Sequence, residues 1–163
     1  MMRAVFLDLD GTLTDSGEGI VKSVDYALGK LDLPALSGDT NWIIGPPLWD
    51  SFSQLGVPED ELEHAVAFYR ERYSKTGYLE NRLYDGILQQ LSDLRDAGYL
   101  MYLATAKPMS YAAKITAHFG ISNYLTDQFG SEEDGTRSDK TSLLAHALSV
   151  AKSTPAQAIM IGD

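Results

Sequence analysis

A short apolar segment close to the N-terminus, ending in two carboxylates, constrains this chain more than any other feature. Residues Ala4 to Leu7 read as a buried strand, since they form an apolar run that contains valine and phenylalanine. Asp8 and Asp10 follow with one residue between them, and Gly11 comes next. Because residues i and i+2 of an extended chain point to the same side, we expect both carboxylates to converge at the carboxyl end of this strand. In open α/β sheets, that end is where ligands bind.

Two carboxylates at one point repel each other, so their proximity needs a physical reason. A divalent cation is the simplest reason, and Mg²⁺ in particular binds through one or two carboxylates together with substrate phosphate. An alternative is a strand followed by an Asx-type turn in which Asp8 and Asp10 are both solvated. The Asp-x-Asp-Gly pattern also suits loops that bind calcium, so these four residues alone slightly favour the solvated turn.

The longer run Asp8-Leu9-Asp10-Gly11-Thr12-Leu13-Thr14-Asp15 closely resembles the first motif of the haloacid dehalogenase superfamily of phosphotransferases. The resemblance implies that Asp8 is a nucleophile that forms an aspartyl-phosphate and that Asp10 is the general acid and base. A carboxylate nucleophile divides phosphoryl transfer into two easier steps. Nearby cations neutralise the charge of the transferring phosphoryl group. Gly11 suits a turn that needs unusual backbone dihedral angles.

Composition narrows the class of protein. The 163 residues are enough for one domain with a modest insertion, and the absence of cysteine excludes disulfides and a thiolate metal site. The 23 acidic and 13 basic residues give a net charge of −10, which disfavours nucleic acid and anionic membranes as partners. A phosphorylated substrate would then need a locally positive pocket. No apolar run approaches the ~18 residues of a membrane span, and no signal-peptide pattern precedes the first strand, so we expect a cytoplasmic protein.

The segment over residues 15–83 is predicted to be helical and to form a domain of its own. Apolar residues recur there at helical spacing, and prolines and glycines separate the periodic stretches. A helical insertion after the first strand resembles the cap of the phosphoglycolate-phosphatase-like branch of the superfamily, which closes over the active site and selects the substrate. Residues 44–48 resemble a cap loop that faces the catalytic centre in that branch, and a plain helix start explains them equally well. Residues 1–14 and 84–163 are then the catalytic core.

The remaining residues alternate between helix and strand patterns. The expected order is a helix over 84–97, a strand over 99–104, a helix from Pro108, a short strand near 128–130, a helix capped by Asp139 and a final strand over 158–161. The strand over 99–104 is almost continuously apolar, as in a parallel strand that is covered on both faces. This succession predicts an α/β fold: a doubly wound, parallel-sheet, Rossmann-like core with an inserted α-helical cap.

Three further positions match the later motifs of the resembled superfamily. Thr105 matches the second motif, and a hydroxyl beside backbone N–H groups at a helix N-terminus holds phosphate well. Lys140 matches the third motif, whose lysine stabilises the charge of the nucleophile and of the phosphoryl oxygens. Asp163, directly after a glycine, matches the opening of the fourth motif, in which this aspartate is a Mg²⁺ ligand. The resemblance therefore implies that Mg²⁺ is held by Asp8, by the backbone carbonyl of Asp10 and by Asp163.

Two more residues are candidates for binding the substrate together with Thr105 and Lys140. Ala106 stands where the phosphoglycolate phosphatase pattern often has asparagine, and this departure puts phosphoglycolate itself in doubt. Arg137 lies in the run over 130–140, which resembles a subgroup of these phosphatases, and its forked donors suit phosphate. Taken alone, Thr105 would be a structural helix cap in most cases, and Lys140 would be a solvated surface lysine.

These motifs together predict a Mg²⁺-dependent phosphatase that hydrolyses a small phosphomonoester through an aspartyl-phosphate. A phosphosugar mutase on the same scaffold is the alternative within enzymes. A non-catalytic interaction domain that kept the fold is the alternative outside them, and the intact set of Asp8, Asp10, Thr105 and Lys140 argues against it. We expect a small phosphorylated substrate, neither nucleic acid nor membrane as a partner, and a monomer or homodimer.

The chain stops directly after the opening of the fourth motif, where the resembled enzymes continue with a second acid, a further helix and at least one more strand. We therefore expect the C-terminal part of the catalytic core to be missing. The strand over 158–161 would lie beside the first strand as an edge with unpaired backbone groups, and such an edge invites pairing with another chain.

Overall fold

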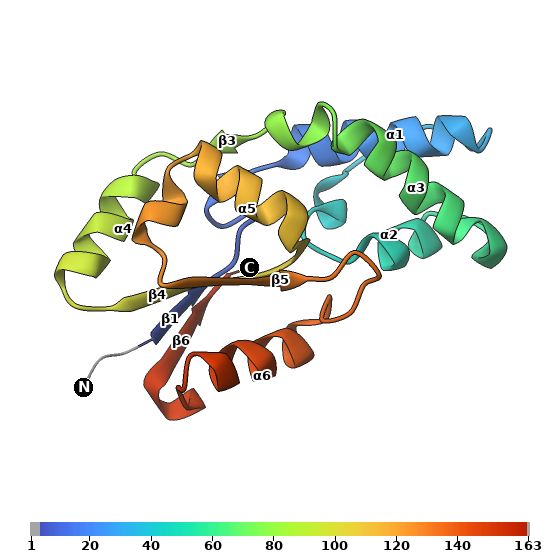
Figure 1. Ribbon diagram of the computed structural model, residues 1–163. Coiled ribbons are helices and arrows are strands. Elements are labelled where there is room, and N and C mark those ends of the chain that lie inside the picture. Colours follow the sequence, from blue (N-terminus) through green and yellow to red (C-terminus); the bar gives the residue numbers. More distant parts are fainter. Residues whose placement is uncertain (1–3, 163) are drawn as a thin grey trace. The chain divides into compact units, whose positions relative to one another are not determined.

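The computed structural model describes residues 4–162 of the chain (Figure 1). These residues form two compact units. The sheet unit consists of residues 4–15 and 83–162, and the helical unit is Ser16–Arg82. Each unit buries apolar side chains of its own and is described by itself.

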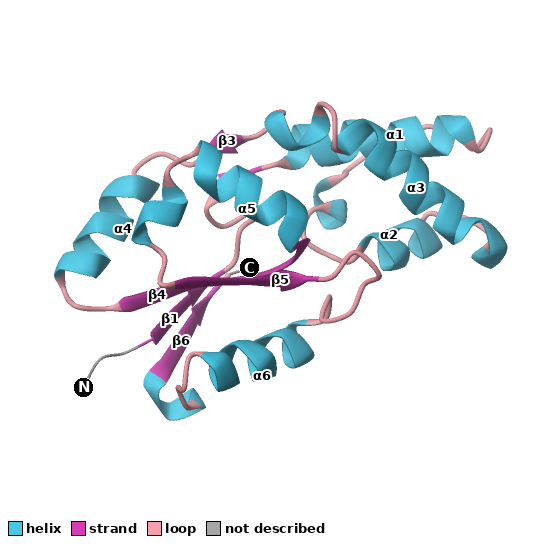
Figure 2. Cartoon of the chain, in the orientation of Figure 1, coloured by secondary structure: helices cyan, strands magenta, loops and turns pink. Residues whose placement is uncertain are grey.

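The main sheet of the sheet unit is parallel, with the strand order β5-β4-β1-β6 among the described residues (Figure 2). Its strands are β1 (Ala4–Leu7), β4 (Leu100–Pro108), β5 (Asp127–Ser131) and β6 (Ala158–Ile161). Leu7, the last residue of β1, lies opposite Leu103 of β4 on one side and Ile161 of β6 on the other. The later chain fills the sheet through β4 and β5 on one side of β1 and then returns to β6 on the other. This reversal makes the carboxyl end of β1 a switch point, where open α/β sheets bind ligands.

Helices cover both faces of this sheet. On one face lie α4 (Ile87–Asp96) and α5 (Met109–His118), and on the other lies α6 (Lys140–Val150), as Figure 1 shows. The expected doubly wound parallel sheet is therefore confirmed. The 3-10 helices η4 (Ile121–Tyr124) and η5 (Pro155–Gln157) also belong to this unit. The strand β2 (Thr14–Asp15) pairs in a separate small sheet with β3 (Arg82–Leu83), whose first residue belongs to the helical unit.

Aromatic and aliphatic side chains fill the space between the sheet and α6. Phe6 of β1 stacks on Tyr102 of β4 with ring centroids 5.0 Å apart. Leu143 and Ala147 of α6 are fully buried in the same cluster. The strand β1 is buried along its whole length because helices cover both of its faces, as continuous apolar runs indicate.

The strand β6 lies beside β1, as expected, and it is the outer strand among residues 4–162. The side chains of Ile159 and Ile161 are 46% and 43% exposed. Within the same residues, no helix combines the length and the apolar character that a membrane span requires.

The structure shifts two expected boundaries in the sheet unit. The strand expected over 99–104 continues to Pro108, because β4 keeps its pairing with β5 across a register shift between Ala104 and Pro108. The helix expected over 84–97 begins only at Ile87. The preceding residue, Gly86, has a φ of 81°, a left-handed conformation that cannot belong to the helix itself.

The helical unit is built from α1 (Gly17–Lys30), α2 (Leu48–Gln54) and α3 (Leu62–Tyr73), with the 3-10 helices η1 (Asn41–Ile43), η2 (Glu59–Glu61) and η3 (Gly77–Leu79) between and after them. Helix α1 packs on α3 and η3, and α2 packs on α3. The apolar residues of α1 are buried at helical spacing, as the sequence indicated. The turn before α3 is the separate 3-10 helix η2, and α3 itself ends at Tyr73.

Within the helical unit, α1 and η3 cross at very close range. A Cβ atom at Gly19 would lie 1.9 Å from the carbonyl oxygen of Gly77. A Cβ atom at Gly77 would lie 2.7 Å from Ser23 Oγ and 2.7 Å from the ring of Tyr73. The backbone N–H of Gly19 donates to the carbonyl of Glu80 at 3.1 Å. Both crossing positions therefore accept only glycine at this separation.

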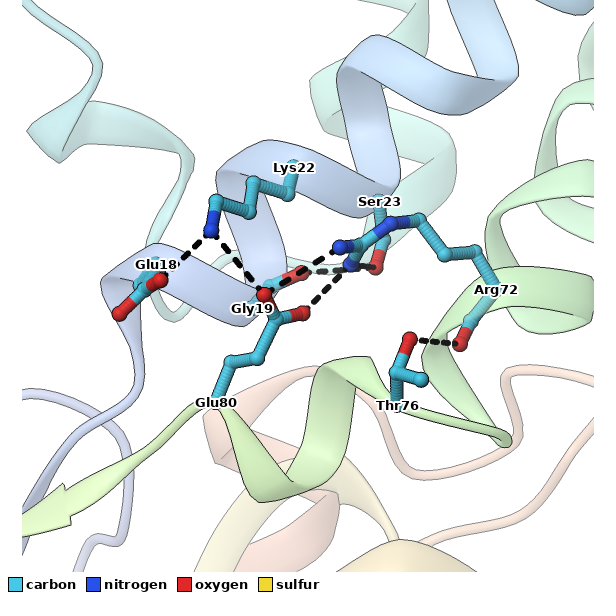
Figure 3. A network of polar contacts seen from close by, with 7 residues as sticks. All are labelled: Glu18, Gly19, Lys22, Ser23, Arg72, Thr76 and Glu80. Atoms are coloured by element: carbon cyan, nitrogen blue, oxygen red, sulfur yellow. Dashed lines mark hydrogen bonds and ion pairs between the residues drawn. The ribbon is translucent and has the colours of Figure 1, made fainter.

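A network of ionic hydrogen bonds lies beside this crossing (Figure 3). Arg72 of α3 donates to both carboxylate oxygens of Glu80, at 2.6 and 3.2 Å, and to Ser23 Oγ at 3.3 Å. Lys22 of α1 donates to Glu80 at 3.2 Å and to Glu18 at 2.6 Å. The forked contact of Arg72 is the stronger part, because it is bidentate and both side chains are largely buried. The Arg72 guanidinium, together with the Lys22 ammonium, lowers the pKa of the Glu80 carboxyl below its ordinary value.

Removing the charge of Glu80 is expected to destabilise the protein in a pH-dependent way. Glu80→Gln should lower the free energy of unfolding by about 1–2 kcal/mol at pH 7, between the values typical of exposed and buried pairs. A carboxyl whose pKa is lowered by folding contributes stability above its unfolded-state pKa, near 4.5. That contribution is lost as the pH falls through the lower folded-state pKa. The difference between wild type and Glu80→Gln, measured by urea unfolding, should therefore shrink as the pH falls below about 4.5.

Glu18→Gln is the matched control for this experiment. Glu18 pairs with Lys22 on the surface of α1, where the side chains are 63% and 52% exposed, and such pairs contribute little. An equal loss of stability in both variants, or a difference for Glu80→Gln that stays constant down to acid pH, would contradict this account.

Candidate active site

The loop that follows β1 is wound around one backbone oxygen. The carbonyl of Leu9 accepts hydrogen bonds from the N–H groups of Thr12, Leu13 and Thr14 at 3.2, 2.9 and 3.1 Å. Gly11 donates to the carbonyl of Thr14 at 2.8 Å and has a φ of 80°, so it adopts the unusual conformation that its place in the motif predicted. The side chain of Leu9 is fully buried, which anchors the loop in the core. The two aspartates therefore flank a fixed residue at the switch point of the sheet.

Asp8 extends the parallel pairing of β1 by one residue. Its N–H donates to the carbonyl of Ile161 at 3.0 Å, and its side chain is 8% exposed. Oδ1 accepts from the N–H of Leu9 at 2.8 Å, and Oδ2 accepts from Lys140 Nζ at 2.5 Å. The backbone at Gly162 passes so close that a Cβ there would lie 3.1 Å from the Cβ of Asp8. This carboxylate is thus buried, oriented and paired with a cation.

Lys140 reaches Asp8 from the first residue of α6. Asp139 caps this helix by accepting from the N–H of Ser142 at 2.8 Å, as the sequence predicted. The hydroxyl and N–H of Ser142 lower the pKa of the Asp139 carboxyl. Lys140 Nζ also donates to the carbonyl of Ala104 in β4 at 3.4 Å. Its side chain is 41% exposed, so the ammonium group remains accessible to a ligand while it contacts Asp8.

Asp10 is paired with a different lysine. Lys107 Nζ lies 3.1 Å from Oδ2 of Asp10, and the two side chains are only 6% and 7% exposed. The other oxygen of Asp10, Oδ1, is buried without a hydrogen-bond partner among the described residues. Sequence reasoning missed Lys107. The sequence does contain one indication: Lys107 closely follows the apolar strand over 99–104. A lysine at such a place is rarely buried unless an acidic side chain pairs with it.

Thr105 is placed differently from the expectation. It was expected at a helix N-terminus, but it lies within β4, fully buried, because the shifted pairing with β5 keeps the chain extended as far as Pro108. Its hydroxyl oxygen accepts from the N–H of Lys107 at 3.2 Å. The carbonyl of Ala106 accepts from the hydroxyl of Ser131 at 2.8 Å. Both residues therefore belong to the carboxyl end of β4, beside the end of β1.

The structure does not join Arg137 to the two aspartates. Arg137 lies in the loop between β5 and α6 with a φ of 61°, and its guanidinium pairs with Glu132 of the same loop. Its Nε is buried without a hydrogen-bond partner among residues 4–162. Glu132 already pairs with the guanidinium of Arg137. The expected contact of Arg137 with a substrate phosphate stays a prediction.

Within the described residues, the acidic side chains of the site supply only part of the ligand set of a hard divalent cation. No group of three histidine, cysteine, aspartate or glutamate side chains that could hold a metal lies within residues 4–162. Asp163, the expected third acidic ligand, lies outside the described residues. Asp8 offers a carboxylate and Asp10 a backbone carbonyl, and Mg²⁺ is a hard cation that takes oxygen ligands. The unpartnered Oδ1 of Asp10 also indicates a carboxylate that is not satisfied by the protein alone.

Charge balance indicates what this arrangement can do. Asp8 and Asp10 are each neutralised by one lysine, in a chain whose net charge is −10. A phosphate group that approached Asp8 would be attracted by Lys140 and repelled by the negative carboxylate. A further positive charge would therefore be needed before the carboxylate could attack. A nucleophilic carboxylate beside an accessible ammonium is suited to phosphoryl transfer assisted by a divalent cation.

Comparisons with known proteins cover almost the whole chain. The family model described as haloacid dehalogenase-like hydrolase matches residues 5–163. The chain is 41% identical over 162 residues to the tyrosine-protein kinase PtkA of Mycobacterium tuberculosis, covering 99% of the chain and 55% of that protein. It is 43% identical over 162 residues to a 5'-nucleotidase of Pseudomonas aeruginosa, covering 98% of the chain and 73% of that protein.

A solved structure is also closely similar. The crystal structure of a predicted phosphatase from Clostridium acetobutylicum matches with a TM-score of 0.94 and 38% identity, covering 100% of this chain and 76% of that chain. The chain thus spans little more than half of the kinase relative and about three quarters of the nucleotidase and of this structure.

Proposed function

Because this chain belongs to the haloacid dehalogenase-like hydrolase family, we propose that its protein is a Mg²⁺-dependent phosphatase that hydrolyses a small phosphomonoester. The observation that supports this most directly is the Asp8 carboxylate. It is buried at the carboxyl end of the central strand β1, with the Lys140 ammonium 2.5 Å from Oδ2. A buried, cation-paired carboxylate at a switch point is the geometry that a phosphoryl-accepting nucleophile requires.

The proposed reaction has two steps. In the first, a carboxylate oxygen of Asp8 attacks phosphorus, the bond to the leaving oxygen breaks, and Asp10 gives its proton to that oxygen. In the second, Asp10 takes a proton from water, the water oxygen attacks phosphorus, and the bond to Asp8 breaks to release inorganic phosphate. Lys140 and the Thr105 hydroxyl would hold the phosphoryl oxygens, and Lys140 would also balance the charge on Asp8. Acid and base catalysis of this kind is typically worth ~10²–10⁴-fold.

The proposed Mg²⁺ would be held by Asp8, by the backbone carbonyl of Asp10 and by Asp163. When bound, it would supply the positive charge that lets a phosphate dianion approach a carboxylate. The unit Ser16–Arg82 is proposed to act as the cap that selects the substrate. This role is the one implied by its resemblance to the cap of the phosphoglycolate-phosphatase-like branch. Arg137 and the backbone at Ala106 are the remaining candidates for substrate contacts.

The metal requirement is the first test. With a panel that includes nucleoside 5'-monophosphates, phosphoglycolate, sugar phosphates and phosphotyrosine, we expect inorganic phosphate to be released from at least one ester when Mg²⁺ is present. EDTA should stop the release, and excess Mg²⁺ should restore it. Ca²⁺ should not restore it, because Ca²⁺ takes more ligands in a looser geometry. Unchanged rates in EDTA would exclude the proposed metal dependence.

The kinase relative favours a second candidate function. That protein is named a tyrosine-protein kinase, and its identity with this chain is 41%. A kinase would transfer the terminal phosphoryl group of ATP to tyrosine, whereas a phosphatase would release phosphate from an ester. Incubation with labelled ATP and a tyrosine-containing protein substrate separates the two. Label that remains on tyrosine would favour the kinase.

The ester panel also tests the phosphosugar mutase, the alternative on the same scaffold. An isomerised sugar phosphate among its products would favour the mutase.

A further inference from the structure

The buried ion pair of Lys107 and Asp10 is not explained by the fold alone. Lysine is rarely buried, and here its side chain is 6% exposed with the ammonium 3.1 Å from Oδ2 of Asp10. Two apolar side chains of similar volume would often be as stable as a buried ion pair, so a buried pair is weak evidence for a purely structural role. The pair holds one oxygen of a carboxylate that is proposed to take part in the reaction.

The backbone of Lys107 is held from several directions. Its N–H donates to Thr105 Oγ1 at 3.2 Å, and the preceding carbonyl, that of Ala106, accepts from Ser131 Oγ at 2.8 Å. On the other side, a Cβ at Gly130 would lie 2.6 Å from the carbonyl oxygen of Lys107, so β5 packs directly against this backbone. The register shift between β4 and β5 falls at the same residues. Lys107 is therefore presented from a rigid, locally irregular part of the sheet.

The two oxygens of Asp10 have different surroundings. Oδ2 is held by Lys107, whereas Oδ1 is buried without a hydrogen-bond partner among the described residues. A buried acceptor without a partner is costly, so such an atom in a native protein requires an explanation, of which a catalytic role or a bound water or ion is an example. With Oδ2 held by Lys107, the side chain of Asp10 cannot rotate freely, and Oδ1 is the oxygen that no described group holds.

We propose that Lys107 is a positioning residue that holds Oδ2 of Asp10, so that Oδ1 is the oxygen that exchanges the proton with the leaving group and with water. The inference rests on the proposed function, because it assigns a role within that reaction. Lys107 keeps its ammonium proton throughout. The proton moves from Oδ1 to the leaving oxygen in the first step and returns to Oδ1 from water in the second, so both the ester and the aspartyl-phosphate depend on this orientation.

Two esters of similar shape provide the test: p-nitrophenyl phosphate, whose leaving group departs readily without a proton, and phenyl phosphate, whose leaving group needs one. In Lys107→Met, we expect kcat/KM for phenyl phosphate to fall about 10–100-fold, part of the ~10²–10⁴ that a positioned acid supplies. For p-nitrophenyl phosphate, kcat/KM should stay within about 3-fold of wild type, because its first step does not need the acid. Its kcat should fall, and a phosphorylated form of the protein should accumulate, because hydrolysis of the aspartyl-phosphate still needs Asp10 as base.

Chemical rescue separates charge from packing, because the printed chain has no cysteine. Lys107→Cys is alkylated in denaturant with 2-bromoethylamine or with 1-iodopropane and then refolded. The two products have the same length, and only the aminoethyl product restores the ammonium group. We expect the aminoethyl form to regain the activity on phenyl phosphate and the propyl form to remain impaired at similar thermal stability. Lys75→Met, at an exposed lysine, should behave as wild type.

The outcomes distinguish this inference from the proposed function. An equal loss on both esters, or equal rescue by both alkylating agents, would show that Lys107 acts only through packing and would overturn the inference. Phosphatase activity that survives Asp8→Asn would instead overturn the proposed function itself. The proposed function and the inference would both be supported by three results together. Activity requires Asp8, Lys107→Met loses more activity on phenyl phosphate than on p-nitrophenyl phosphate, and only the aminoethyl group restores it.

Discussion

Asp8→Asn is expected to reduce phosphate release roughly 10⁴–10⁶-fold, the loss seen when a covalent nucleophile is removed. The amide has almost the same shape as the carboxylate, but it has only one acceptor oxygen, so it keeps only one of the two contacts that orient Asp8, with Lys140 or with the N–H of Leu9. It cannot attack phosphorus to form an acyl phosphate. The fold should therefore persist while the chemistry stops.

Two measurements would check this loss. Steady-state phosphate release gives its size, and quenched reactions with labelled ester should give a hydroxylamine-sensitive label in wild type and none in Asp8→Asn. Asp127→Asn is the matched control, since Asp127 is an exposed acid at the first residue of β5, at the opposite end of the sheet's strands from the site. It should leave both readouts unchanged. Near-normal turnover by Asp8→Asn would rule out the covalent mechanism.

Gly19→Ala is expected to destabilise the protein by about 3 kcal/mol, near the upper end for overpacking a closely packed site. The new Cβ would lie 1.9 Å from the carbonyl oxygen of Gly77, and this neighbour is backbone, which cannot swing away as a side chain can. Helix α1 and η3 would have to separate, which would also strain the hydrogen bond from the N–H of Gly19 to Glu80. For a chain of this size, the melting temperature should fall by roughly 6–12 °C.

Gly29→Ala is the matched control in the same helix. A Cβ at Gly29 meets no atom within 4 Å, so the substitution adds helix propensity without a clash and should stabilise by up to about 1 kcal/mol. Both tryptophans, Trp42 and Trp49, lie in the helical unit, so tryptophan fluorescence during urea unfolding reports on the unit that carries both substitutions. The prediction fails if the two variants change stability in the same direction.

The fold was largely predictable from the sequence because its elements are set by local patterns. Continuous apolar runs indicate strands, and β1, β4 and β6 follow such runs. Of these, β1 and β4 are buried, as strands covered on both faces are, whereas β6 is partly exposed. The cap of α6 at Asp139 and the left-handed Gly11 are equally local, since each depends on a few neighbouring residues. The alternation of strand and helix then permits few topologies, of which the doubly wound parallel sheet is the simplest.

The candidate site divides between what the sequence determined and what only tertiary structure decided. Asp8 and Asp10 were found from their spacing at the carboxyl end of a strand, and Lys140 was found from its match to the third motif of the resembled superfamily. That Lys107 is buried against Asp10 depended on the register shift between β4 and β5, which no local pattern records. The same shift holds Thr105 in a strand rather than at a helix N-terminus.

Two further contacts could also be seen only in the folded chain, because they depend on how the segments pack together. The crossing joins Gly19 and Gly77, which are 58 residues apart in the sequence. They are two of the chain's 14 glycines, and nothing in the sequence indicates that their backbones meet. The pairing of Arg137 with Glu132 was equally hidden, since a loop arginine can turn to an acid of its own loop or to a phosphate. Composition and periodicity indicate which apolar residues are buried and, broadly, in what elements. Which polar side chains meet depends on register and crossing distance, and these are settled only when the elements pack together.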